Sequence, residues 1–131
     1  MKLLTIILLT VSLVSSETNE EAKKSLEKLL KDLDVFMMKE NDKYLCASIG
    51  FIYNFVYQDC TKKRMETHDL FNRIWKTPNS FTTGNFTNVS VDSEGIVAFE
   101  LEYGEKSLMK GTAKRDGRNT LRFVRMEEKN C

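Results

Sequence analysis

Aromatic side chains alternate with other residues in the middle of the chain. The stretch FIYNFVYQD, residues 51–59, begins with a ring at every second position. Successive side chains of an extended strand point to opposite faces, so this spacing predicts a strand with its rings on one side. Aromatic and β-branched residues also suit a pleated, half-buried surface. The four rings belong to Phe51, Tyr53, Phe55 and Tyr57, and we expect them to face the core or a cavity.

Helical patterns lie on both sides of this strand. Residues 18–38 place apolar side chains at three- and four-residue spacing, which predicts an amphipathic helix capped by Thr18 or Asn19. Residues 42–50 predict a second, short helix. Residues 61–77 predict a third helical segment, or a shorter one beginning at His68, that ends before Pro78.

The pattern changes to short strands after Ser80. Apolar and polar side chains alternate in four segments, and residues typical of tight turns separate them. We expect turns at 92–95, at 104–106 and at Asp116–Gly117, the last as a two-residue hairpin. The predicted strands are 82–92, 96–103, 107–115 and 120–127. Helices followed by a run of antiparallel strands predict an α+β fold.

The first 16 residues have the pattern of a secretory signal peptide. Lys2 precedes an apolar run that begins at Leu3, and the segment closes on the small residues Ser15 and Ser16. The run is shorter than the ~20 residues that a membrane-spanning helix needs. We therefore expect residues 1–16 to be cleaved and residues 17–131 to form a single secreted, extracellular domain, with no membrane contact after cleavage.

The charge balance argues against a nucleic-acid partner. The full chain has 20 Lys and Arg residues and 19 Asp and Glu residues. Cleavage of the signal peptide would remove Lys2 and leave equal numbers of basic and acidic residues. Because nucleic-acid binding depends on a basic excess that neutralises phosphates, we expect neither a nucleic acid nor an anionic membrane as partner.

The cysteine count is odd. Cys46, Cys60 and Cys131 would give one disulfide and a leftover thiol, or a bond between two chains. We favour Cys46–Cys60, which closes a loop of about 15 residues and contributes ~3 kcal/mol in the chain-entropy account. Two alternatives stay open, in which Cys131 bonds either to Cys60 or to a second molecule. With His68 as the only histidine and no CxxC pair, we expect no metal site and no cofactor.

Two N-glycosylation acceptor patterns occur in the first of the four later strands. Asn85-Phe-Thr and Asn88-Val-Ser both match Asn-x-Ser/Thr. In a secreted chain we expect at least one of the two asparagines to be glycosylated, with Asn85 favoured because it stands at the strand entry. A sugar there would exclude that surface from a tight interface.

The order of elements resembles the nuclear transport factor 2-like superfamily. The segment Phe36-Met-Met-Lys-Glu-Asn-Asp, then Leu45 and the strand at 51–57, is similar to that family's early helix pair and first strand. The segment from Cys60-Thr-Lys-Lys to Phe71-Asn-Arg-Ile-Trp75 resembles its third helix. The resemblance covers nearly all of residues 20–128 in element order. It implies N-terminal helices packed in a strongly bent, cone-like antiparallel sheet with a pocket inside.

Two other folds of this size fit less well. Cystatin-like inhibitors usually carry a Gln-x-Val-x-Gly loop, which does not occur in this sequence. A small lipocalin-like barrel would not accommodate so long a helical half before Pro78.

The sequence assigns no catalytic residue. Some members of the superfamily are isomerases, dehydratases or cyclases that use a pocket carboxylate with a tyrosine or a second acid. No motif in this sequence matches the catalytic positions of those enzymes, so we assign no catalytic residue from the resemblance. His68, beside Asp69, fits a solvent-facing or capping role better than that of a base. The side chains that could supply acid–base groups are Asp59, Tyr53, Tyr57, Glu100, Glu102 and Tyr103.

These observations predict a secreted, non-enzymatic domain that holds a small apolar ligand in its cone pocket. The pocket would be lined by Phe51, Tyr53, Phe55 and Tyr57, although rings of this kind also fill protein cores. Two alternatives stay open. One is a protein-interaction module that forms a homodimer, often through the open sheet face in this superfamily, and the other is a small acid–base enzyme.

Overall fold

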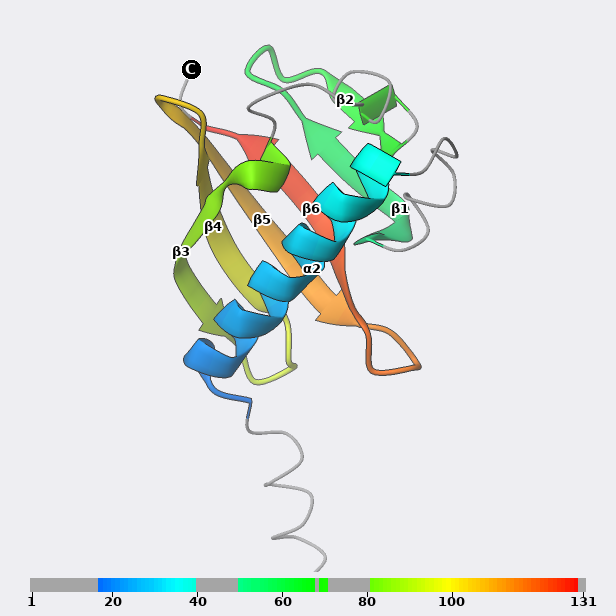
Figure 1. The fold of residues 1–131 in the computed structure, drawn as a ribbon, viewed down its shortest axis with the longest axis vertical. Helices are drawn as coiled ribbons and strands as arrows, with labels where there is room; N and C mark the ends of the chain where they lie inside the picture. Colours follow the sequence, from blue (N-terminus) through cyan, green and yellow to red (C-terminus); the bar gives the residue numbers. More distant parts are fainter. Residues whose placement is uncertain (1–16, 40–49, 68, 71–80, 130–131) are drawn as a thin grey trace, which may run out of the picture.

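The computed structural model describes residues 17–39, 50–67, 69–70 and 81–129, and shows one long helix lying across one face of a six-stranded sheet (Figure 1). The strand order is β2-β1-β6-β5-β4-β3. The elements are α2 (Asn19–Lys39), β1 (Phe51–Gln58), β2 (Arg64–Glu66), the 3-10 helix η1 (Phe81–Thr83), β3 (Asn85–Val91), β4 (Val97–Tyr103), β5 (Ser107–Arg115) and β6 (Leu121–Glu128).

Helix α2 confirms the predicted amphipathic pattern. Thr18 caps the helix, because its hydroxyl accepts a hydrogen bond of 3.1 Å from the backbone N–H of Glu21. Asn19 instead ties the helix to the sheet edge, since its Oδ1 accepts a 3.0 Å hydrogen bond from the N–H of Val91. The stripe that faces the sheet is fully apolar and consists of Ala22, Leu26, Leu29, Leu30 and Leu33, all buried.

The four later strands form the antiparallel series that the sequence predicts. Strand β3 pairs with β4, β4 with β5, and β5 with β6, each antiparallel. Strand β1 then joins the free edge of β6 in a parallel pair, which the sequence did not reveal. The inward side chains of the sheet meet the α2 stripe in one core. Its largest fully buried members on the sheet are Phe123, Leu101, Met109, Met126 and Val97.

The segment after β1 differs from the prediction of a helix from residue 61. Residues 64–66 form β2, which runs antiparallel to β1 and pairs Met65 with Tyr57. A tight turn forces this hairpin: Asp59 Oδ1 accepts hydrogen bonds from the N–H groups of Thr61 and Lys63, and Lys62 adopts a left-handed φ of 67°. Helical backbone begins only at Thr67, in line with the shorter alternative.

The turn between β5 and β6 is wider than the two-residue hairpin predicted at Asp116–Gly117. The N–H of Asp116 bonds to the carbonyl of Thr120, and Asn119, not Gly117, takes the left-handed conformation with a φ of 62°. The Asp116 carboxylate accepts hydrogen bonds from the Thr120 and Arg118 amides, and these lower its pKa. The predicted turn at Asp92 is confirmed, with Gly95 at a φ of 80°.

One ring of the aromatic strand faces away from the core. Phe51, Phe55 and Tyr57 are buried, whereas Tyr53 is fully exposed. Strict alternation therefore fails at this position. The exception falls where the β1–β6 ladder is irregular, between Phe51 and Val56, and the inward alternation resumes at Phe55.

Three of the predicted segments lie wholly or partly outside the described residues. They are the signal peptide at 1–16, most of the short helix at 42–50, and the end of the third helical segment before Pro78.

Candidate binding site

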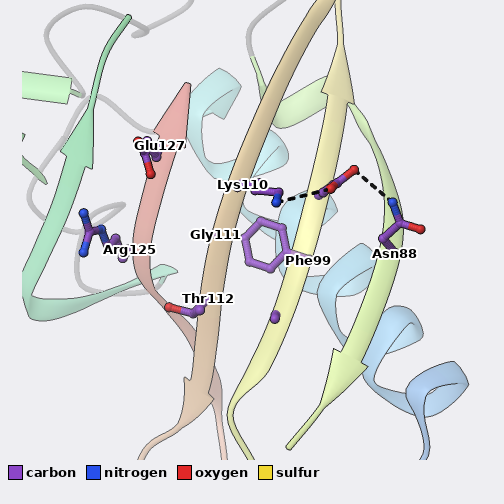
Figure 2. A pocket seen from close by; sticks show the side chains of 9 residues that line it. Asn88, Phe99, Lys110, Gly111, Thr112, Arg125 and Glu127 are labelled. Atoms are coloured by element: carbon purple, nitrogen blue, oxygen red, sulfur yellow. Dashed lines mark hydrogen bonds and ion pairs between the residues drawn. The ribbon is translucent and has the colours of Figure 1, made fainter. Parts of the chain in front are cut away.

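A group of polar and charged side chains lies on the face of the sheet opposite α2. Strands β3 to β6 cross this outer face, and α2 runs behind them in the close view (Figure 2). Outward side chains alternate with the buried ones, so that Lys110 and Thr112 point outward from β5 while Met109 and Ala113 point into the core. We call this surface the outer face and define it by Asn88, Ala98, Glu100, Lys110, Thr112, Arg125 and Glu127.

A hollow of about 340 Å³ opens on the outer face. Gly111 and Phe99 line it together with the residues of the outer face. A Cβ at Gly111 would lie 2.6 Å from Phe99 Cζ and 2.6 Å from the carbonyl oxygen of Arg125, so only glycine lets the ring approach β5 this closely. The Phe99 ring packs edge-on against Phe86, with centroids 5.1 Å apart, and against Phe123 at 5.6 Å. A rigid aromatic ring therefore supports the hollow.

Charges of both signs surround the hollow. Glu100 accepts a 3.0 Å hydrogen bond from Asn88 Nδ2 and forms an ion pair with Lys110 at 3.8 Å (Figure 2). Glu127 pairs with Lys129 at 3.2 Å and with Lys62 at 3.7 Å. The hydrogen bond from Lys129 is the main cause that lowers the pKa of Glu127, so this carboxyl stays ionised near neutral pH. The outer face therefore offers alternating acidic and basic groups.

Asn88 reaches the outer face because of a break in strand β3. The β3–β4 register shifts between Thr87 and Ser90, and Asn88 adopts a left-handed φ of 50°. Asparagine is among the residues that tolerate this conformation. Asn85 is also exposed, at the first position of β3. Both predicted glycosylation acceptors thus lie on an edge strand, but Asn88 alone contributes to the hollow on the outer face.

A second polar arrangement joins the ends of β1 and β6. The hydroxyl of Tyr57 donates a hydrogen bond to Glu128 Oε1, and the backbone N–H of Cys60 donates to Glu128 Oε2 at 3.3 Å. Partial burial raises the pKa of Glu128, and the Cys60 hydrogen bond opposes this shift. The pair is a carboxyl and a phenol in a half-buried setting, which are the groups that acid–base chemistry uses.

A second hollow, of about 400 Å³, lies between α2 and the segment from η1 into β3. Lys23, Glu27 and Lys31 project from α2 along it, and Asn85 contributes from β3. At the helix side, Thr82 donates a 2.9 Å hydrogen bond to Asp34. This hollow is polar and partly charged.

The predicted pocket residues do not form one group. The ring centroid of Phe51 lies 4.5 Å from that of Phe55 and 5.6 Å from that of Phe123, so these rings contribute to the core. Tyr57 is buried beside them and Tyr53 is in solvent. Their role toward a ligand stays a prediction. The pairing of Cys60 also stays a prediction, because Cys46 and Cys131 lie outside the described residues, as does His68.

The other side chains considered for acid–base chemistry are dispersed. Asp59 organises the β1–β2 turn, Glu100 belongs to the outer face, Glu102 is exposed and Tyr103 is half-buried. Sequence reasoning missed Glu128 as the partner of Tyr57, and it missed the hollow at Gly111. A glycine within a strand pattern is a signal for close backbone approach and could have indicated the latter.

Within residues 17–39, 50–67, 69–70 and 81–129, no three His, Cys, Asp or Glu side chains gather as metal ligands would. In the same part of the chain, none of the helices combines the length and the apolar character needed for a membrane crossing.

Comparison with known proteins bears on the fold. Neither a protein-family model nor a curated protein matches the sequence. Among solved structures, the chain is similar to an NTF-2-like protein of unknown function from Pseudomonas aeruginosa, with a TM-score of 0.51 and 13% identity over 86% of this chain and 96% of that one. It is also similar to a protein from Parabacteroides distasonis provisionally named a ketosteroid isomerase, with a TM-score of 0.48 and 10% identity over 76% of this chain and 83% of that one.

The class of protein follows from the architecture and the first of these structures. A helix packed against a six-stranded curled sheet is the α+β, cone-like plan. The chain has the nuclear transport factor 2-like fold, as its element order predicts.

Proposed function

We propose that this chain is a secreted, non-catalytic domain that acts by binding, and that its outer face binds a second copy of the same chain. The observation that carries the proposal is the hollow over Gly111 and Phe99 on a broad sheet face. In the part of the chain that the structure describes, α2 and η1 contact one another and the opposite side of the sheet, which leaves the outer face open.

The charge pattern supports a second copy as the occupant. A two-fold interface brings one surface patch against the same patch of its partner, so the patch must complement itself. Glu100 and Glu127 supply negative charge, and Lys110 and Arg125 supply positive charge, on neighbouring strands. Rotation of one copy can therefore place acidic groups against basic ones. Such complementarity fixes orientation more than it adds affinity.

Burial of the aromatic rings argues for this function over a ligand in the cone. Phe51, Phe55 and Tyr57 are at most 3% exposed and contact other core side chains. A ligand among them would have to displace rings that already fill the interior, whereas the hollow on the outer face needs no rearrangement. A small apolar ligand is accordingly our second choice among binding functions.

One observation supports the alternative function, that of a small acid–base enzyme. Glu128 has a raised pKa and receives a hydrogen bond from Tyr57. In an enzyme of this type, these two groups would be the acid–base pair. Glu128 stands at the end of β6, beside the β1–β2 turn, and its other oxygen is engaged by the N–H of Cys60. This engagement fits a structural role better than a role in proton transfer.

Secretion with cleavage after Ser16 is compatible with the contacts of the described residues that follow the cleavage site. Glu17, the first residue after the predicted cleavage site, forms a 2.6 Å ion pair with Arg115 of β5. Arg115 also donates to the hydroxyl of Ser25 on α2 at 3.2 Å. A mature chain that begins at Glu17 would keep these contacts and lose no described element.

Native mass spectrometry of the secreted, enzymatically deglycosylated protein tests the proposal. We expect twice the mass of residues 17–131, under reducing as well as non-reducing conditions. Thr112→Arg would place a long charged side chain in the hollow and should give a monomer. Lys24→Glu, on the exposed side of α2, is the matched control and should remain dimeric.

Other outcomes would each exclude the proposal in a different way. A monomer at high protein concentration would exclude self-association. A monomer with a bound small molecule would favour the ligand function instead. A doubled mass that disappears with reductant would indicate a disulfide between chains. A dimer unaffected by Thr112→Arg would place the interface elsewhere.

A further inference from the structure

The hairpin between β5 and β6 concentrates positive charge. The chain as a whole has 20 basic and 19 acidic residues, so an excess of either sign in one segment is local. The turn projects from one end of the sheet (Figure 1), and a Cβ added at Gly117 would meet nothing within 4 Å. We call residues 114–122 the basic hairpin; its charged members are Lys114, Arg115, Asp116, Arg118 and Arg122.

Two of these cations stand side by side on the outer side of the sheet. Ala113 and Leu121 are buried against the core, so the next residue along each strand, Lys114 or Arg122, points outward. The β5–β6 ladder pairs Lys114 directly with Arg122. Like charges at directly opposed positions repel each other. An anion bound between these two side chains would remove that repulsion.

The carboxylate of Asp116 offsets only part of this charge. Its Oδ1 accepts hydrogen bonds from two N–H groups of the turn, at 2.8 and 3.0 Å, and its Oδ2 lies 2.9 Å from Arg122 Nε. This ion pair engages one edge of the guanidinium group, and the Arg122 side chain remains 31% exposed. Lys114 and Arg118 are exposed, and neither forms an ion pair with another described residue.

Other acidic side chains near the basic hairpin do not cancel its charge. Glu17 is bound to Arg115, which points to the α2 side of the sheet, where it also contacts Ser25. In the adjacent β3–β4 turn, Asp92 accepts hydrogen bonds from two N–H groups of its own turn. Glu94 of that turn is exposed and supplies one negative charge against the three remaining cations of the basic hairpin.

We propose that the basic hairpin binds a sulfated polysaccharide of the heparin type. Short segments rich in lysine and arginine are typical of sites for such polymers and for nucleic acids. Ammonium and guanidinium groups donate charge-assisted hydrogen bonds to anionic oxygens. One sulfate lies between Lys114 and Arg122, and Arg118 contacts the next anionic group along the polymer. This binding uses one copy of the chain and does not depend on self-association.

A nucleic acid fits the basic hairpin less well. Single strands bind largely through aromatic side chains on which their bases stack. Residues 114–122 contain no aromatic residue, and Phe123, which follows them, is fully buried. The fully exposed ring of Tyr53 lies on β1, which β6 separates from β5. A polymer that needs only a row of cations is therefore the better match.

Heparin affinity chromatography of the secreted protein tests the proposal. We expect retention at about 0.15 M NaCl and elution at a higher salt concentration than from a sulfonate cation exchanger, which measures charge alone. Calorimetry with a heparin oligosaccharide then gives the affinity. Chemically desulfated heparin, which keeps its carboxylates, should not bind.

A matched pair of double variants locates the site. Lys114→Gln combined with Arg118→Gln should weaken heparin binding about tenfold, because two ionic contacts are lost. Lys24→Gln combined with Lys31→Gln removes the same charge from exposed positions of α2 and should bind heparin as the parent chain does. All four side chains are exposed, so we expect unchanged melting temperatures, which thermal unfolding verifies.

Four results would each overturn the proposal. The first is elution from heparin at no higher salt than from the sulfonate exchanger. The second is an equal loss of affinity in the two double variants. The third is equal binding of heparin and its desulfated form. The fourth is a single-stranded oligonucleotide of equal charge that binds the hairpin more tightly than heparin does, which would assign the site to nucleic acid.

Discussion

The phenol of Tyr57 donates a hydrogen bond to the carboxylate of Glu128, a residue 71 positions later in the chain. The contact joins the ends of β1 and β6 on the inward side of the sheet. It also explains why Tyr57, a residue with a polar group, can be buried to 3% exposure among apolar side chains. A buried hydroxyl needs a partner, and Glu128 supplies it.

Replacement of Tyr57 by Phe should therefore destabilise the fold modestly. The ring would keep its packing, but Glu128 would lose a hydrogen bond worth about 1–2 kcal/mol. Urea unfolding at neutral pH measures the change. Tyr53→Phe is the matched control, and because its ring is fully exposed we expect a change of less than about 0.5 kcal/mol. Equal effects of the two substitutions would show that the Tyr57–Glu128 contact does not contribute.

The raised pKa of Glu128 predicts a pH dependence of stability. Burial raises this pKa above its ordinary value of 4.5, so the folded state holds the proton more tightly than the unfolded state does. The free energy of unfolding should therefore fall as the pH rises from about the ordinary value through the folded-state pKa. Glu128→Gln, which cannot ionise, should remove this component. Unfolding curves of both chains between acidic and neutral pH measure it, and parallel pH profiles would contradict the assignment.

Gly111 should tolerate no side chain. Gly111→Ala would place a Cβ 2.6 Å from both Phe99 Cζ and the Arg125 carbonyl oxygen, and overpacking of this kind costs about 1–3 kcal/mol. Gly117→Ala has open space around the new Cβ and should change stability by less than about 0.5 kcal/mol. Chemical denaturation of both variants provides the comparison. A neutral Gly111→Ala would mean that the Phe99 ring can move out of the way.

A glycan on Asn88 should be incompatible with self-association through the outer face. Its side chain contacts Glu100 beside the hollow, so an attached sugar would stand within the interface. We expect chains glycosylated at Asn88 to be monomeric, and Ser90→Ala, which removes this acceptor pattern, to be dimeric without enzymatic deglycosylation. Asn85→Gln removes the other acceptor and serves as the control. Light scattering gives the oligomeric state, and a dimer with Asn88 occupied would place the interface elsewhere.

Much of the fold could be read from local patterns. The leucine stripe of α2, the alternation in β3 to β6 and the turn at Asp92 each depend on side chains close in sequence, and all are present. The prediction failed where a local signal competed with another contact. Met65 fits an amphipathic helix, but the hydrogen bonds of Asp59 turn the chain so that Met65 pairs with Tyr57 in a hairpin.

The candidate site was less accessible to such reasoning, because its parts come from four strands. Nothing near Asn88 in the sequence indicates Glu100, Lys110 or Arg125, and the hollow depends on the Phe99 ring lying against a glycine of the neighbouring strand. Register between strands sets these contacts, and register is a property of the whole sheet.

The sequence by itself determined the long helix α2, the strands β1 and β3 to β6, and the class of fold, because helix and strand periodicities are local and the order of elements restricts the topology. Only the tertiary structure decided which polar side chains meet. The parallel pairing of β1 with β6 brings Tyr57 and Cys60 to Glu128, across 71 and 68 positions of sequence. Such contacts depend on the relative positions of two strand ends, and no local pattern in the sequence encodes these positions.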